Sequence, residues 1–268
     1  MIRMAQSEIW ATMVVRGISM AAVFAVVWML FRRQTNPFRD RDWVTVGIAW
    51  GCANIFFTAS VFLTSTANLV FILAFNPMIA ALLSWAIIGE RPAAATWAAI
   101  LATLGGVAII VAGGLDRGTG WGDIAAVLCA SCIAYSLVVS RKSGMDMSLA
   151  PGLGSLITVA VAIPFLVRNG AWPGNIWWLL ANGLVLIPAA SYCLALAPRY
   201  IAAEQVAMFY LLETVLAPVW VWAIFSEVPS RNSLIGGAIL IAALVAHSAW
   251  QLHEGRKRRA ATGIRHPA

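Results

Sequence analysis

The feature that most constrains this chain is a series of long apolar runs separated by short breaks. Each run spans about 18 to 25 residues, the length that a helix needs to cross roughly 30 Å of hydrocarbon at 1.5 Å per residue. Hydrophobic residues make up 61% of the 268 residues and charged residues only 11%, whereas soluble proteins carry roughly 25% charged residues. An ordinary soluble protein is therefore excluded, and the sequence predicts an all-α, polytopic membrane helical bundle.

Nine membrane spans are predicted, because turn residues such as Asn36-Pro37, Gly113-Gly114 and Pro229 mark the breaks between the runs. The spans are expected at residues 12–31, 43–63, 65–88, 95–113, 122–140, 150–167, 177–197, 203–226 and 232–250. No break is long enough to hold a separate domain.

The distribution of positive charge predicts the orientation of the chain. Thirteen of the 18 Lys and Arg residues lie in the tail or in the loops after the first, third, fifth and seventh spans. Because such residues are retained in the cytoplasm, we expect a cytoplasmic carboxyl terminus in a bacterial-type inner membrane. The net charge of +7 comes from loops and tail, so no nucleic-acid partner is predicted. The basic tail, 251–268, is instead expected to contact membrane lipid.

An internal repeat is visible when the chain is shifted by 137 residues against itself. The shift aligns Trp85-Ala86-Ile87, Glu90 and Pro92 with Trp222-Ala223-Ile224, Glu227 and Pro229. Paired spans are five apart, so the two copies, 12–113 and 122–250, are expected to have inverted topology. Span 122–140 has no partner, which suggests a five-plus-five bundle whose first helix is missing. Either the true start lies upstream of Met1, or this is a nine-span variant.

The same motifs resemble a known family. They are Asn76-Pro77, the turn Gly89-Glu90-Arg91-Pro92, and Glu213 to Pro218 followed by Glu227 and Pro229. With these residues most of the chain resembles the drug/metabolite transporter superfamily, specifically the EamA-type exporters built from tandem five-helix repeats. The resemblance implies export of small metabolites, whose identity varies across the superfamily, and a central cavity lined in part by the first helix. This chain departs from the pattern in lacking that helix and in having Ser226 at the second turn.

Glu213 is the leading candidate for a substrate contact. It lies ten residues into its span, about 15 Å by helical rise and thus near the bilayer midplane. Its repeat partner, Asn76, is expected at the same depth, where transporter sites usually lie. An ionisable group there marks a pathway by default and could bind a proton or a substrate ammonium. The alternative is a protonated glutamate that bonds a neighbouring helix.

Other polar and aromatic residues share helix faces that could line a cavity. The predicted substrate contacts are Asn54, Ser131, Tyr135, Tyr192, Tyr210 and Trp220. Tyr210 and Trp220 lie on the Glu213 face, where an aromatic wall suits a large or cationic ligand. Core or lipid packing is the alternative for each aromatic residue. Gly47 and Gly51, on the Asn54 face, also fit close helix packing.

Four further residues are predicted to shape the helices and their ends. Pro77 and Pro218 remove backbone hydrogen bonds in mid-span, which suits either a moving helix or a simple kink. Glu90 and Glu227 recur at equivalent turns, where each could pair with an Arg. Arg16, near the start of the first span, is expected to extend its side chain to the outer interface.

These observations predict a secondary transporter that exports small metabolites by alternating access. Amino acids or related compounds are the substrates that the resemblance alone suggests. Proton coupling through Glu213 is a hypothesis based on its depth in the membrane. The alternatives are a multidrug or cationic-compound exporter, a non-transporting truncated chain and a membrane-embedded enzyme. An enzyme is not favoured, because the sequence shows no nucleophile with a neighbouring base and no pair of acids that is free of flanking arginines. No cofactor or metal is predicted, since Cys129 and Cys132 lie in mid-span and His247 has no second ligand nearby. A homodimer is compatible with the sequence.

Overall fold

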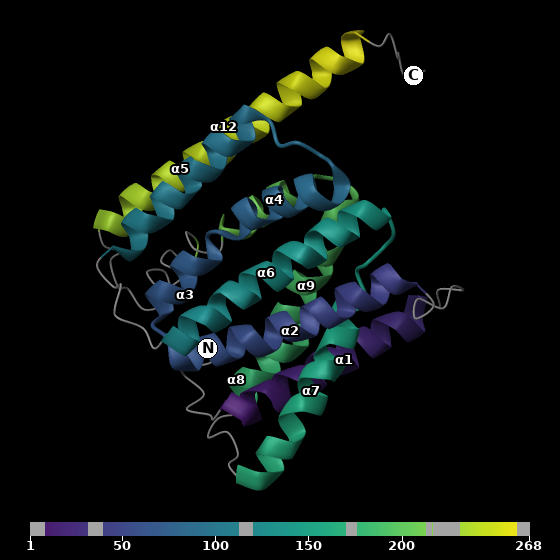
Figure 1. Ribbon diagram of the computed structural model, residues 1–268. Coiled ribbons are helices and arrows are strands. Elements are labelled where there is room, and N and C mark those ends of the chain that lie inside the picture. Colours follow the sequence, from purple (N-terminus) through teal and green to yellow (C-terminus); the bar gives the residue numbers. More distant parts are fainter. Residues whose placement is uncertain are drawn as a thin grey trace. The chain divides into compact units, whose positions relative to one another are not determined.

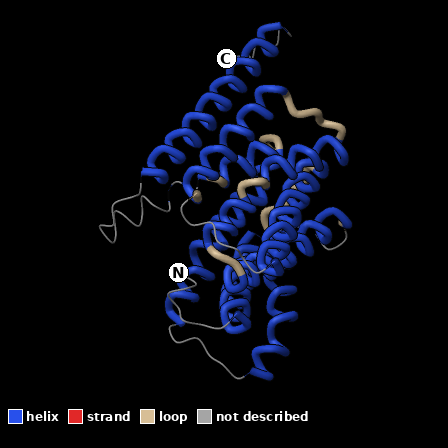
Figure 2. Tube along the Cα trace, turned by 60° about the vertical axis from the view of Figure 1, so that its left-hand side comes forward, coloured by secondary structure: helices blue, strands red, loops and turns tan. Residues whose placement is uncertain are grey.

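The computed structural model describes residues 9–31, 40–112, 120–169, 176–212, 216 and 231–261 (Figure 1). All regular structure in these ranges is helical, as the trace in Figure 2 shows. The helices are α1 (Ile9–Phe31), α2 (Arg41–Leu63), α3 (Thr66–Leu73), α4 (Asn76–Ile88), α5 (Ala94–Val111), α6 (Gly120–Ser143), α7 (Ala150–Asn169), α8 (Ile176–Ala181), the π-helix η3 (Asn182–Leu186), α9 (Ile187–Leu196), the 3₁₀ turn η4 (Ala197–Arg199), α10 (Ala203–Tyr210) and α12 (Arg231–Ala261).

Within the described residues, eight helical segments are long and apolar enough to cross a membrane. They are Ile9–Leu30, Arg41–Leu63, Ala67–Ile88, Ala94–Val111, Gly120–Ser143, Ala150–Arg168, Ile176–Arg199 and Leu234–Gln251. Their ends fall within a few residues of the predicted spans, and the polytopic helical bundle is confirmed. The remaining predicted span, 203–226, begins with α10 and otherwise lies almost entirely outside the described residues.

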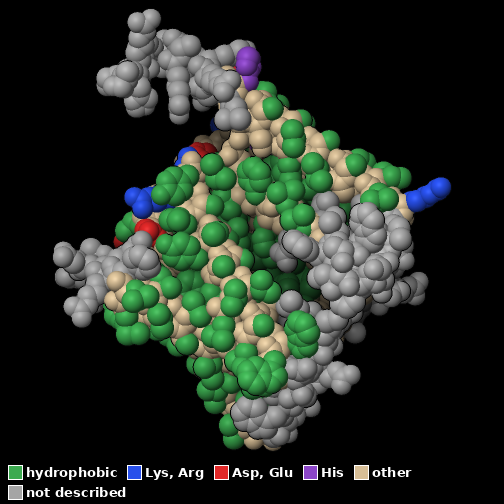
Figure 3. All heavy atoms as spheres, turned by 180° about the vertical axis from the view of Figure 1, so that it is seen from behind, with side chains coloured by type: hydrophobic (Ala, Val, Ile, Leu, Met, Phe, Trp, Pro, Cys, Tyr) green, Lys and Arg blue, Asp and Glu red, His purple; other side chains and the backbone are tan. Residues whose placement is uncertain are grey.

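Large apolar side chains cover much of the surface (Figure 3). Val167 is 78% exposed and Trp177 is 76% exposed. A water-soluble monomer rarely exposes contiguous apolar surface of this kind, whereas hydrocarbon chains of lipid make contact with it at no cost. The outer surface of the bundle is therefore suited to a membrane.

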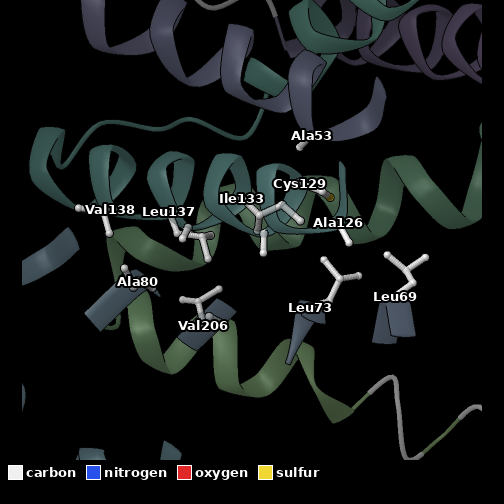
Figure 4. Packing of buried hydrophobic residues seen from close by; sticks show 14 residues of the cluster. Ala53, Leu69, Leu73, Ala80, Ala126, Cys129, Ile133, Leu137, Val138 and Val206 are labelled. Carbon is white, nitrogen blue, oxygen red and sulfur yellow. The ribbon is translucent and has the colours of Figure 1, made fainter. Parts of the chain in front are cut away.

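The described helices form two compact units, and the larger comprises residues up to Arg91 together with 114–207. In this unit α6 packs against α2, α3 and α4, while α7 packs against α1 and α2. Figure 4 shows how their apolar side chains meet around α6. Ala53 and Leu73 contact the same buried cluster as Cys129, Ile133 and Val206. Small residues in this cluster allow the helix axes to approach closely.

The third predicted span is divided into two helices. α3 ends at Leu73, a turn follows at residues 74 and 75, and α4 begins at Asn76. Pro77 occupies the first turn of α4, where its missing N–H is tolerated because no intrahelical acceptor is available there. The sequence predicted a disturbance at Pro77, and the structure shows a two-residue turn there whose residues, Ala74 and Phe75, keep a right-handed helical backbone.

The seventh predicted span contains a π-helix that the sequence analysis did not predict. η3 joins α8 to α9, and the Ile187 N–H donates to the carbonyl oxygen of Asn182 across the widened turn. Pro188 follows directly and has no N–H to donate, which removes one of the bonds that would hold the segment in α-helical form.

The smaller unit comprises 92–113 and the residues from Met208 onward. In it, α5 and α12 lie side by side (Figure 1). Gly106 and Gly236 meet at their contact, where a Cβ on Gly106 would lie 2.7 Å from the carbonyl oxygen of Gly236. α12 continues past the end of the predicted span at residue 250 to Ala261, so the first part of the basic tail is helical.

Glycines also set the contact between α2 and α7. A Cβ on Gly154 would lie 2.6 Å from the backbone nitrogen of Gly51 and 2.9 Å from the carbonyl oxygen of Gly47. Both obstacles are backbone atoms, which cannot rotate away. Gly47 and Gly51 therefore act in close helix packing, one of the two roles that their spacing suggested.

We predict that Gly154→Ala destabilises the protein by about 1–3 kcal/mol, because the added methyl group forces α2 and α7 apart. The matched control is Gly105→Ala in α5, where a Cβ meets nothing within 4 Å. That control should be neutral or stabilising by about 0.5–1 kcal/mol through helix propensity. Thermal unfolding of both variants in detergent tests this, and equal melting temperatures for the two would contradict the close contact.

Candidate functional site

A small cavity lies in the larger unit, among α1, α2, α7 and α9. It is partly open and leaves room for about one water molecule. Its polar lining comes from three helices and consists of Arg16 from α1, Asn54 and Thr58 from α2, and Ser155 and Thr158 from α7. Ile187 of α9 and methionines of α1 complete the wall. Polar residues from three helices thus meet around one small space whose open surface is mainly apolar.

Arg16 is buried in the protein, and the expected extension to the membrane interface is wrong. Its exposure is 8%, and the side chain lines the cavity. Arg16 is the eighth residue of α1, about 10 Å along the helix from Ile9. The correction has a physical basis, since α2, α7 and η3 pack around α1 and leave the side chain an internal position instead of a lipid-facing one.

The neutral polar groups of the cavity are held by local bonds to helix backbone. The Asn54 Nδ2 donates to the carbonyl oxygen of Trp50 at 3.1 Å, and the Thr58 hydroxyl donates to that of Asn54 at 2.9 Å. The Thr158 hydroxyl donates to the Gly154 carbonyl oxygen at 3.0 Å. The Ser155 hydroxyl donates in the same way to Gly152, at 2.7 Å. These bonds fix the side-chain positions and use the three hydroxyl hydrogens and one of the two amide hydrogens of Asn54.

Asn76, the predicted partner of Glu213, lies at the contact between α4 and α6 and does not line this cavity. Its side chain is 2% exposed, and its Nδ2 donates to the carbonyl oxygen of Ala130 at 2.9 Å. The bond joins two helices, which is the structural role that polar groups commonly play within membranes. A substrate contact at Asn76 stays a prediction.

The other predicted contacts are spread over several helices. Tyr135 packs partly buried against a cluster containing Trp43 and Trp50. Ser131 donates its hydroxyl to the Val127 carbonyl oxygen at 2.8 Å on its own helix. Tyr192 is half-buried in α9, and Tyr210 ends α10. Of all the predicted contacts within the described residues, Asn54 alone lines the cavity.

Several predicted residues lie outside the described part of the chain. They are Glu213 and Trp220 among the substrate contacts, and Pro218 and Glu227 among the structural residues. Their roles stay predictions.

Glu90 lies two residues beyond the end of α4, and its carboxylate oxygen is 3.7 Å from the Nε of Arg141 in the last turn of α6. Both side chains are partly exposed, so the contact contributes little to stability, about 0–1 kcal/mol. It nevertheless shows that the ends of α4 and α6 lie on the same side of the bundle. At the opposite ends, the Thr64 hydroxyl of α2 donates to the Asp123 carboxylate of α6 at 2.7 Å.

Sequence reasoning missed four of the five polar residues that border the cavity, namely Arg16, Thr58, Ser155 and Thr158. Arg16 carried a usable signal, because a charge inside an apolar span marks a functional site by default. Ser155 and Thr158 are three residues apart in one span and so share a helix face, but similar pairs occur on helices that only pack. Within the described residues, no group of three His, Cys, Asp or Glu side chains could hold a metal ion.

Comparisons with known proteins agree with this architecture. A protein of known crystal structure superimposes with a TM-score of 0.76 at 19% sequence identity, covering 90% of this chain and 88% of the other, which supports the fold alone. A "Probable terminal-alkyne amino-acid exporter" of Streptantibioticus cattleyicolor is 27% identical over 209 residues, which cover 74% of this chain and 67% of that protein. The model of the EamA-like transporter family matches residues 2–112 and 120–248. The chain therefore belongs to the EamA-like transporter family and is a multi-pass membrane protein.

Proposed function

We propose that this protein exports amino acids or closely related metabolites across the bacterial inner membrane by alternating access. The family supports a small-molecule transporter rather than an enzyme. The substrate class is supported by the relative named as an amino-acid exporter. The structural observation that carries the proposal is a bundle of membrane-length helices in which Arg16 of α1 and Asn54 of α2 border one small internal space.

The proposal includes two halves of inverted topology, residues 12–113 and 122–250, that rock against one another. The family model matches two stretches of similar extent, 2–112 and 120–248. Contacts at the helix ends agree with alternating spans. Glu90 and Arg141 meet at the ends predicted to be cytoplasmic, and Thr64 and Asp123 meet at the ends predicted to be external.

We expect that cells expressing the chain accumulate one or a few amino acids outside the cell, relative to cells carrying an empty vector. Mass spectrometry of the medium, with L-propargylglycine added in one arm as an alkyne-bearing amino acid, measures this. Expression should also raise the tolerated concentration of that compound, because export lowers its concentration inside the cell. Unchanged amino-acid levels and tolerance, with the protein detected in the membrane, would contradict amino-acid export.

Proton coupling through Glu213 is part of the proposal and predicts a pH-dependent rate. A carboxyl group that must bind and release a proton during each cycle cannot be replaced by an amide without loss of that dependence. Transport by Glu213→Gln in proteoliposomes should therefore be several-fold slower and should not respond to an imposed pH gradient. Glu254→Gln, the same chemical change in the basic tail outside the predicted spans, is the control. Unchanged transport by Glu213→Gln across a pH series would rule out the coupling role.

The predicted orientation places the basic tail in the cytoplasm. A fluorescent protein fused after Ala268 should therefore fold and fluoresce, whereas alkaline phosphatase fused at the same position should be inactive, because it matures only outside the cytoplasm. The opposite pair of results would contradict the predicted orientation of the chain and place its carboxyl terminus outside the cytoplasm. Fusions after residue 169, at the end of α7, should give the reverse pattern and serve as the control.

A further inference from the structure

We infer that Glu204, in the first turn of α10, is a proton-binding site whose protonation decides which carboxylate Arg141 pairs with. In the larger unit this carboxyl group interacts with charges at the ends of α4 and α6. The ligand is a proton, so the inference depends neither on the substrate class nor on Glu213.

Glu204 is buried although it carries an ionisable group. Its exposure is 7%, and its neighbours Ala203 and Val206 belong to the apolar cluster around α6. Figure 4 shows Val206 facing Leu137 of α6 within this cluster. A carboxylate in such surroundings loses most of its hydration, so either a partner or a proton has to compensate for the loss.

One oxygen of the Glu204 carboxyl group, Oε2, has no hydrogen-bond partner among the residues that the structure describes. The backbone N–H of the same residue donates a hydrogen bond to the carboxyl group. A buried, ionised oxygen without a donor is unfavourable, and binding of a proton removes the charge that causes the cost. The carboxyl group is thus suited to hold a proton in the arrangement that the structure shows.

Two charged side chains act on Glu204 from the surrounding helices within the described part of the chain. They are Glu90, which follows α4, and Arg141, in the last turn of α6. α10 itself contributes no other charged side chain. Two carboxylates and one guanidinium carry an excess of one negative charge, which a single proton balances. The buried carboxyl group is where that charge is tolerated least.

The observed ion pair is the one that a protonated Glu204 allows. The Nε of Arg141 lies 3.7 Å from the Glu90 carboxylate, while the Oε2 of Glu204 has no partner. After the proton leaves, Arg141 is attracted by both carboxylates, and water screens the buried one less. Arg141 is long and 31% exposed, so it can turn from Glu90 toward Glu204. The proton therefore controls whether an ion pair joins the ends of α4 and α6.

Carbon-13 NMR of the purified full-length chain in neutral detergent tests the inference. The protein is labelled at the carboxyl carbon of glutamate, and the signal that is missing in Glu204→Gln belongs to Glu204. Its chemical shift is followed from about pH 5 to about pH 9, without substrate, and gives the midpoint of proton binding. We expect Glu204 to change from protonated to ionised within this range.

Removal of each neighbouring charge should move this midpoint in opposite directions. Arg141→Gln removes an attraction to the ionised carboxylate, so Glu204 should bind its proton about tenfold more tightly. Glu90→Gln removes a repulsion and frees Arg141, so proton binding should weaken by about tenfold. Lys142→Gln is the matched control, because it removes the same charge from the exposed neighbour of Arg141, which does not act on Glu204.

The exchange of partners has its own readout in the same spectra. The Glu90 signal, identified by its absence in Glu90→Gln, should shift at the midpoint of Glu204, because Arg141 leaves Glu90 at that pH. Groups that interact in this way titrate as a coupled set. In Glu204→Gln, which is always neutral, this step in the Glu90 signal should disappear.

Three results would overturn the site: Glu204 keeps one protonation state across the range, Arg141→Gln moves its midpoint no more than Lys142→Gln, or the Glu90 signal has no step at that midpoint. Where Glu204→Gln does not fold, Glu204→Asp keeps the charge and still removes the labelled signal. The export assay separates this inference from the proposed function. A chain that exports no amino acid can still show the titration, and a chain that exports amino acids without it loses only the site.

Discussion

Hydrocarbon offers no hydrogen-bond partners, so every polar group that crosses the membrane must find one within the protein. The helices satisfy their own backbone, and most of the polar side chains inside the larger unit follow the same rule. The hydroxyls of Ser136 and Ser140 donate to carbonyl oxygens on their own helix. Other polar groups bond a different helix and so help to hold the bundle together. Asn76 of α4 donates to a carbonyl oxygen of α6, and the Ser60 hydroxyl of α2 donates to the Gly122 carbonyl oxygen of α6.

The cavity lies beside the close contact between α2 and α7, where polar residues follow the packed glycines. Gly51 and Gly154 bring the backbones of α2 and α7 into contact. Asn54 lies three residues after Gly51, and Ser155 directly follows Gly154, so the polar residues are carried to the edge of this contact. Glycine allows the approach, and the larger residues beside it determine the space that remains. The helices around the cavity are therefore spaced by backbone contact, with little freedom to relax.

The sequence predicted the fold well, because the length and apolarity of each span are local properties that the bilayer imposes directly. Eight spans were located within a few residues, and the interruption near Pro77 followed from the missing N–H of proline. The cavity was not predicted, since its wall depends on which helices become neighbours. Arg16 on α1 and Thr158 on α7 lie far apart in the chain, and no periodicity within one span indicates that they meet. Asn54 was found because small and polar residues share one face of a single helix.

The π-helix η3 has a consequence for the helical phase of its span. A turn that closes over five residues instead of four admits about one extra residue, which rotates everything after it by roughly 100° relative to an uninterrupted α-helix. The faces of α8 and α9 are therefore out of phase. A relative with a regular helix here would present a different side chain at the position of Tyr192 unless its sequence were one residue shorter. In an alignment of this family, a gap of a single residue between positions 182 and 186 would therefore indicate a helix without the π-helical turn, whose second half has the regular rotation.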